Sequence, residues 1–267
     1  MKNVLRSIYY FLIELLRINI FRTLYINFKT QPFNIAIKFP ILVYGKLVIP
    51  MLKGKLLIDA PIETGMIKIG YKYLDLVPAA FLPTQLYLFN GTIIFNGKSI
   101  ISGGVSLFSS NSIINFGKNV VIGGGSMIKS LDSISIGDNT RIAYENVVFD
   151  SNVHYVKNID SGKISKNKAP IIIGENCWIN SRSFIGKGSI LPDYTIAAGS
   201  SFINKDYSKF GNNIFLAGSP AKPIGDKVQR IFSMNQEAKL NSFFENNDKE
   251  FLNEEKGLFL DSNDMFN

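Results

Sequence analysis

Residues 173–203, IGENCWINSRSFIGKGSILPDYTIAAGSSFI, decide the expected fold. Every sixth residue in this stretch is aliphatic, and the residue four places after each of the first five is small. The aliphatic set is Ile173, Ile179, Ile185, Leu191, Ala197 and Ile203, and the small set is Cys177, Ser183, Ser189, Thr195 and Ser201. One bulky and one small inward position per hexad predict a narrow parallel β-helix with three flat faces and about 18 residues in each coil.

The hexads continue upstream with slips in phase, which indicate bulges or small loops at the corners. Three further phases are Ile136, Ile142 and Val148, then Phe116, Ile122 and Ile128, then Leu88, Ile94 and Ile100. A period of six excludes a sandwich or a propeller, whose strands repeat at longer spacing. We therefore expect a β-helix domain over 41–222, which would make about ten coils if it followed the hexad repeat throughout. An N-terminal amphipathic helical segment over 1–40 and a C-terminal helical tail over 223–267 are also expected.

Composition limits the chemistry before any motif is considered. The 267 residues are 46% hydrophobic and 19% charged, so the chain can bury a core and is not wholly disordered. A net charge of +8 suits anionic ligands or a phospholipid surface. The single cysteine, Cys177, excludes a disulfide framework and fits a reducing compartment. The single histidine, His154, excludes a multi-histidine metal site and is the first candidate for acid–base chemistry.

Residues 1–28 are apolar and basic, with Glu14 as their only acid. A signal peptide is not expected, because no small-residue cleavage site follows an uninterrupted apolar run. A spanning helix is not expected either, because polar residues interrupt every 20-residue window. The apolar residues keep roughly helical spacing: Leu5, Ile8, Leu12, Leu15, Leu16 and Ile20. Two interpretations stay open: a helix packed on the protein body, and an interfacial helix that gives peripheral contact with an anionic membrane.

Several segments together resemble the hexapeptide-repeat acyltransferases. They are residues 172–180, Gly186-Lys187-Gly188, 197–201, Asn204-Lys205-Asp206 and the stretch AGSPAK at 217–222. The nearest likeness is to galactoside, maltose and nodulation sugar O-acetyltransferases and to those of bacterial surface polysaccharides. The match is strong over 134–224 and weaker over 88–133. The resemblance implies a left-handed β-helix, a homotrimer, and acetyl-CoA bound in the groove between neighbouring subunits.

The resemblance also points to a catalytic residue. Residues 150–154 resemble the family's segment with the catalytic histidine, and 155–170 then break the hexad as a loop that family likeness places over the acceptor site. His154 is therefore expected to act as general base on a sugar hydroxyl. Asp150 is the nearest carboxylate and the expected catalytic partner that orients the imidazole. Four extended residues span about 13 Å, so this contact requires a bend. A corner role for Asp150, with a backbone carbonyl orienting the ring, is the alternative.

Positions that match the family's cofactor contacts are Ser181, Gly199, Ser201, Asn204, Lys205 and Lys222, and Trp178 is a further cofactor candidate because of its outward position. The two lysines are placed to meet CoA phosphates. Trp178 faces outward as a wall for the pantetheine arm or acceptor, or else as a trimer-interface residue. Asn152 and Glu145 are the candidate acceptor contacts. The family's acceptor-binding asparagine corresponds here to Gly123-Gly124-Gly125, so the acceptor's identity is not transferable. Cys177 occupies an inward position and is interpreted as a packing residue rather than an acyl nucleophile.

The predicted function is acetyl-CoA-dependent O-acetylation of a sugar hydroxyl in surface polysaccharide biosynthesis, of capsule or lipopolysaccharide. The acceptor is a glycan or lipid-linked glycan, and the enzyme is expected in the cytoplasm or at the inner face of the cytoplasmic membrane. Neither a metal nor a nucleic-acid partner is expected, and a hexapeptide carbonic anhydrase would need three histidine ligands. Two alternatives remain: an N-acetyltransferase of a nucleotide-linked amino sugar, and a non-catalytic β-helix scaffold.

Overall fold

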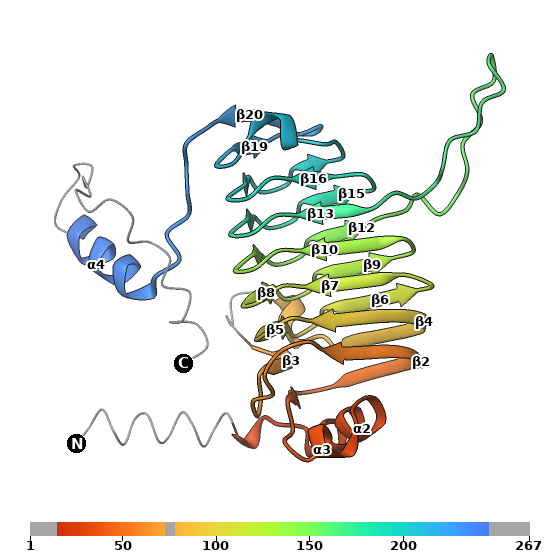
Figure 1. The fold of residues 1–267 in the computed structure, drawn as a ribbon. Coiled ribbons are helices and arrows are strands. Elements are labelled where there is room, and N and C mark those ends of the chain that lie inside the picture. The colour runs from red at the N-terminus through yellow and green to blue at the C-terminus, as the bar shows by residue number, and fades with distance from the viewer. Residues whose placement is uncertain (1–14, 73–77, 246–267) are drawn as a thin grey trace.

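The computed structural model describes residues 15–72 and 78–245. Parallel strands stack coil upon coil into an elongated three-sided solenoid (Figure 1). We name its faces A, B and C in chain order. Face A consists of β1 (Ile41–Val43), β3 (Ile67–Tyr71), β5 (Ser99–Ser102), β8 (Val120–Ile122), β11 (Arg141–Ile142), β14 (Trp178–Ile179), β17 (Ile196–Ala197) and β19 (Phe215–Ala217).

Faces B and C have fewer separate strands than face A. Face B contains β6 (Ser106–Ser110), β9 (Met127–Ser130), β12 (Val147–Phe149), β15 (Phe184–Gly186) and β18 (Phe202–Ile203). Face C contains β7 (Ile113–Phe116), β10 (Ser133–Ile136), β13 (Ile171–Ile173) and β16 (Ile190–Leu191). The long strands β2 (Leu47–Ile58) and β4 (Thr84–Phe95) pair with each other, and β4 pairs with β6 through its first half and β7 through its second, so both faces begin on them.

The hexad positions form the core as predicted. The six aliphatic residues from Ile173 to Ile203 and the five small residues from Cys177 to Ser201 are each at most 1% exposed. The hydroxyl groups have a role that the size pattern does not reveal. Ser189, Thr195 and Ser201 each donate to the carbonyl three residues earlier, at 2.6, 2.6 and 2.7 Å. Each small side chain therefore satisfies a buried corner carbonyl as well as fitting the crowded bend.

The number of coils is lower than an unbroken hexad repeat would give. Over residues 15–72 and 78–245, face A has eight parallel strands, which correspond to eight coils rather than about ten. The repeat is 18 residues where Trp178 pairs with Ile196, but 20 where Val121 pairs with Arg141, and 21 where Leu86 pairs with Leu107. The figure of about ten holds only for an unbroken hexad repeat, and longer corners and inserted loops use the extra residues.

An asparagine ladder marks the corner between faces C and A. Asn119, Asn139 and Asn176 have φ angles of +56°, +57° and +54°, a left-handed conformation that asparagine tolerates better than most residues. Their side chains donate from coil to coil, from Asn119 to Asn139 at 3.2 Å and from Asn139 to Asn176 at 3.1 Å. The ladder stabilises the sharp corner and ties successive coils together.

Helices cover the N-terminal end of the solenoid. α2 (Ile20–Thr30) and the short α3 (Phe33–Ala36) lie beyond β1 and β2 (Figure 1). The Asn27 side chain donates to the Ile41 carbonyl at 2.7 Å, and the Thr23 hydroxyl accepts from the Val43 amide at 3.0 Å. These bonds satisfy the backbone of the edge strand β1. Across the described ranges, no helix has the length and apolar character that crossing a bilayer requires. Half of the predicted membrane segment, residues 1–14, lies outside them.

The C-terminal residues cross face A. The last strand, β20 (Lys222–Gly225), pairs antiparallel with β19. Two short 3-10 turns lie earlier in the chain, η1 (Pro78–Phe81) before β4 and η2 (Ser208–Phe210) before β19. Residues 226–233, which we call the strap, then run down the solenoid to α4 (Met234–Phe244) (Figure 1). The Val228 amide donates to the Asn213 carbonyl at 3.3 Å, and Phe232 is only 4% exposed. The expected C-terminal helix is confirmed.

Candidate active site

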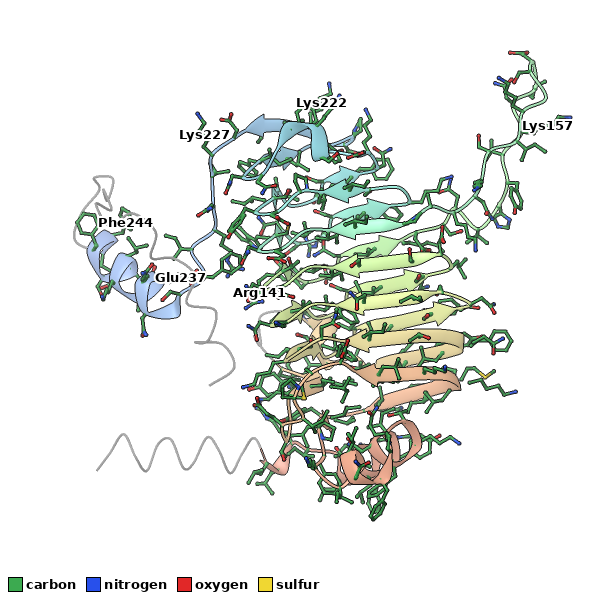
Figure 2. All side chains as sticks on the ribbon, viewed as in Figure 1. Arg141, Lys157, Lys222, Lys227, Glu237 and Phe244 are labelled. Carbon is green, nitrogen blue, oxygen red and sulfur yellow. The ribbon has the colours of Figure 1, made fainter. Side chains whose placement is uncertain are left out.

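The segment that interrupts the hexads forms a projecting arm. Residues 151–170 leave the solenoid between β12 and β13 and extend far from it (Figure 1). Isolated antiparallel bridges join Ser151 to Lys168 and Lys157 to Ile164, so the excursion is a two-stranded arm rather than an irregular loop. Figure 2 shows Lys157 in the outer part of this arm, away from the body.

His154, the predicted base, lies at the root of the arm in a tight turn. Its backbone amide donates to the Asn152 carbonyl at 2.6 Å, which closes a three-residue turn around Val153. Val153 has a φ of +63°, a conformation that strains a β-branched residue. Strain of this kind persists only where surrounding contacts impose it, and it is concentrated at functional sites. The His154 side chain is exposed.

Two polar residues impose this turn. The Asn167 side chain donates to the Val153 carbonyl at 2.8 Å, and the Asn167 carbonyl accepts from the Asn152 amide at 2.7 Å. The Ser151 hydroxyl accepts from the Val153 amide at 2.9 Å. Sequence reasoning missed both Ser151 and Asn167 because no repeat relates the outgoing and returning strands of the arm. Together they hold the backbone of the turn that leads to His154.

Asp150 does not point toward His154 within the protomer. Its side chain is fully buried and accepts from the Ser130 hydroxyl at 2.7 Å, the Leu131 amide at 2.8 Å and the Asp132 amide at 2.9 Å. All three donors belong to the corner of the preceding coil. The geometry therefore differs from the expected catalytic pair, because the strand alternation turns Asp150 inward at the bend. It matches the corner role that the sequence left as the alternative.

The predicted ligand contacts fall on different edges of the prism. Edge AB, between faces A and B, includes residues 143–146, 180–183 and 198–201, whereas edge BC includes 150–170, 187–189 and 204–206. Ser181 and Gly199 lie on edge AB, and Asn204 and Lys205 lie on edge BC with His154. One protomer does not bring them together, because face B lies between the two edges.

Three of the predicted cofactor contacts, Ser201, Trp178 and Lys222, differ in burial and in their hydrogen-bond or ring contacts. Ser201 is 1% exposed; its hydroxyl donates to Ala198, its amide to Ser183, and its carbonyl accepts from Phe184. Trp178 is half-buried on face A, with the Arg230 guanidinium of the strap 4.9 Å from its ring centre. Lys222 is exposed on β20 at the C-terminal end (Figure 2).

The predicted acceptor contacts are also separated. Glu145 lies on edge AB and forms an ion pair with Arg182 at 2.8 Å, whereas Asn152 is exposed beside His154 on edge BC. Only Asn152 shares an edge with the predicted base.

The remaining candidate chemistry is limited. Burial raises the pKa of the Cys177 thiol to about 12, so the thiol stays protonated and is unsuited to form an acyl-enzyme. The described ranges contain no group of three or more His, Cys, Asp or Glu side chains placed to bind a metal.

Comparisons with known proteins establish the fold. No protein-family model and no curated protein sequence matches the chain. Among solved structures, the polySia-specific acetyltransferase NeuO is 20% identical with a TM-score of 0.53, over 76% of this chain and 93% of that chain. Galactoside acetyltransferase in complex with coenzyme A is 23% identical with a TM-score of 0.41, over 59% and 76%. A variant of AntD, an N-acyltransferase from Bacillus cereus, in complex with dTDP and coenzyme A, is 14% identical with a TM-score of 0.35, over 76% and 87%. The likeness to NeuO confirms the predicted fold, a left-handed β-helix.

Proposed function

We propose that this chain is an acetyl-CoA-dependent O-acetyltransferase that modifies a sugar hydroxyl of a surface polysaccharide, capsule or lipopolysaccharide, in the cytoplasm. The observation that supports this most directly is the single histidine, exposed at the root of an arm on an acetyltransferase fold and preceded by a strained turn. In a solenoid built from hydrogen-bonded hexads, His154 is the residue best suited to acid–base chemistry.

The proposed reaction is direct transfer. The His154 imidazole accepts the proton of the sugar hydroxyl as its oxygen attacks the thioester carbonyl of acetyl-CoA. The tetrahedral intermediate collapses with loss of the CoA sulfur, and the imidazolium returns the proton to that sulfur. The products are the acetylated sugar and free CoA, with His154 restored to its neutral form. Backbone amides are the expected donors to the oxyanion.

A homotrimer explains why the predicted contacts are divided between two edges. In a cyclic trimer, edge BC of one subunit faces edge AB of the next, since every interface joins the same two surfaces. The pantetheine arm would lie against Ser181 and Gly199, while Lys205 and Lys222 meet the phosphates. In this proposal His154 of one subunit acts on acetyl-CoA bound between that subunit and its neighbour.

The charge of the arm supports an acidic glycan as acceptor. Residues 151–170 contain Lys157, Lys163, Lys166 and Lys168 but only one acid, Asp160. A surface of this charge attracts a polyanion by long-range electrostatics. The specificity of NeuO for polySia also supports such an acceptor.

The proposal is tested by an assay that also locates the site. Wild-type protein is incubated with acetyl-CoA and acidic or neutral polysaccharides, and acetyl ester is measured on the glycan. Two inactive variants, His154→Ala and Gly199→Trp, are then mixed by unfolding and refolding. Only an interface that combines an intact His154 with an intact neighbouring edge is active, so random trimers should recover about one quarter of wild-type activity. No recovery would contradict a shared site, and no transfer to any glycan would contradict the function.

Asn167→Ala is expected to lower kcat by roughly tenfold to a hundredfold while leaving CoA affinity unchanged, because the His154 turn loses its clamp. Steady-state kinetics with varied acetyl-CoA separate the two parameters. Asn158→Ala is the matched control, since Asn158 contacts only Ser161 within the arm through its side chain. Equal kcat in both variants would mean that the clamp does not position His154.

A further inference from the structure

The helical cap at the N-terminal end has an inverted distribution of polar and apolar side chains. A helix packed on a soluble protein ordinarily turns its apolar face inward. In α2 the buried residues are Thr23, Ile26 and Asn27, and the two polar ones bind the edge of β1 as described above. Apart from Arg22 and Lys29, the exposed side chains of α2 are large and apolar, and exposed apolar side chains continue on either side of the helix. They are between 39% and 86% exposed, and we call them the cap surface: Leu16, Ile20, Phe21, Leu24, Tyr25, Phe28, Phe33 and Ile37.

The same part of the chain is positively charged throughout. Residues 15–58 contain no aspartate or glutamate. Their basic residues are Arg17, Arg22, Lys29, Lys38, Lys46, Lys53 and Lys55. A partner for this region must be apolar and anionic together. A second copy of the same surface would bring like charges together, which disfavours self-association through the cap.

The cap surface lies at one end of the solenoid. α2 and α3 are beyond β2 and β3, at the end opposite β20, whereas the arm projects from the other half of the molecule (Figure 1). A flat partner can therefore cover the end of the molecule without contacting the arm or edge BC.

From these observations we infer that the cap surface binds the interface of an anionic phospholipid bilayer. The 11 residues of α2 span about 16 Å, short of the roughly 30 Å hydrocarbon core, so the helix lies in the plane of the membrane. Its aromatic and aliphatic side chains enter the boundary between headgroups and acyl chains, while arginines and lysines meet the lipid phosphates. The surface centres on residues 16–38, later in the chain than the segment 1–28 indicated by sequence. The inference does not depend on the proposed acetyl transfer.

Vesicle flotation with the full chain tests this inference. Phosphatidylcholine vesicles with and without phosphatidylglycerol are used, and binding is measured for wild type, Phe21→Ser and Phe33→Ser. Both phenylalanines are more than 70% exposed, so their loss should not disturb folding. Each variant is expected to bind anionic vesicles about tenfold less tightly, the effect of exposing a buried phenylalanine. Arg22→Gln should weaken binding about fivefold on anionic vesicles and leave binding to neutral vesicles unchanged.

A control and two contrary outcomes complete the test. Ile224→Ser removes a comparably exposed apolar side chain, 61% exposed, from the opposite end and should bind vesicles as wild type does. Residues 1–14 are intact in every variant. Wild-type vesicle binding by both phenylalanine variants would therefore overturn the inference, even if the protein binds membranes by another segment. Self-association that these variants abolish, in the absence of vesicle binding by wild type, would overturn it in favour of a second copy.

Discussion

His154→Ala is expected to lower the rate of acetyl transfer by about 10²–10⁴-fold, the usual contribution of a positioned general base. The fold should survive because the His154 side chain is exposed and its backbone bond to Asn152 does not need the imidazole. The measurement is kcat for acetyl transfer with saturating acetyl-CoA, together with CoA affinity by calorimetry. CoA affinity should stay at the wild-type value, since the proposed contacts to CoA do not include the imidazole.

Asp160→Ala is the control for the His154 variant, because Asp160 is exposed in the same arm. It should leave kcat near the wild-type value. Transfer by His154→Ala at the wild-type rate would contradict the general-base mechanism, although the protein would still be an acetyltransferase. A variant that lost CoA binding along with turnover would instead indicate that His154 organises the cofactor groove.

Much of the fold follows from the period of six because each hexad places one aliphatic and one small side chain in the core. If Ile179 or Ser183 faced outward, its strand would lose register with the strands of the neighbouring coils. The spacing of residues in the sequence therefore determines which side chains are buried. The number of coils was not predictable in the same way. A corner accommodates two or three extra residues outside the core, as in the coils that pair Val121 with Arg141, and the hydrophobic pattern then shows only a slip in phase.

The candidate site was less predictable than the fold because it depends on contacts between segments with no common repeat. His154 stands out by composition alone, but the Asn167 clamp exists only once the arm returns to its root. Similarity of motifs grouped Ser181 with Lys205, although the prism places them on separate edges. Spacing along a solenoid indicates which face a residue occupies, whereas a ligand site between subunits depends on which edges meet.

Asp150→Ala is expected to lower the free energy of unfolding by about 3–5 kcal/mol. The change removes an acceptor that serves three donors, the Ser130 hydroxyl and the Leu131 and Asp132 amides, in a fully buried corner. Each donor left without a partner adds a desolvation cost, and the missing side chain leaves a cavity. Asp150→Asn should have a smaller effect, because one carbonyl oxygen remains while the amide group faces a donor. Denaturant unfolding at neutral pH measures both differences.

The two Asp150 variants also decide between a structural and a catalytic carboxylate. If Asp150 only stabilises the corner, Asp150→Asn should lose stability and keep most of its kcat at a temperature where it is folded, since the asparagine preserves the bend that leads to the arm. An orienting partner of His154 would give the opposite result, with wild-type stability and a loss of kcat close to that of His154→Ala. The three donors of the 130–132 corner favour the first outcome, because a carboxylate that already accepts from all of them has little capacity left for an imidazole on the outer surface.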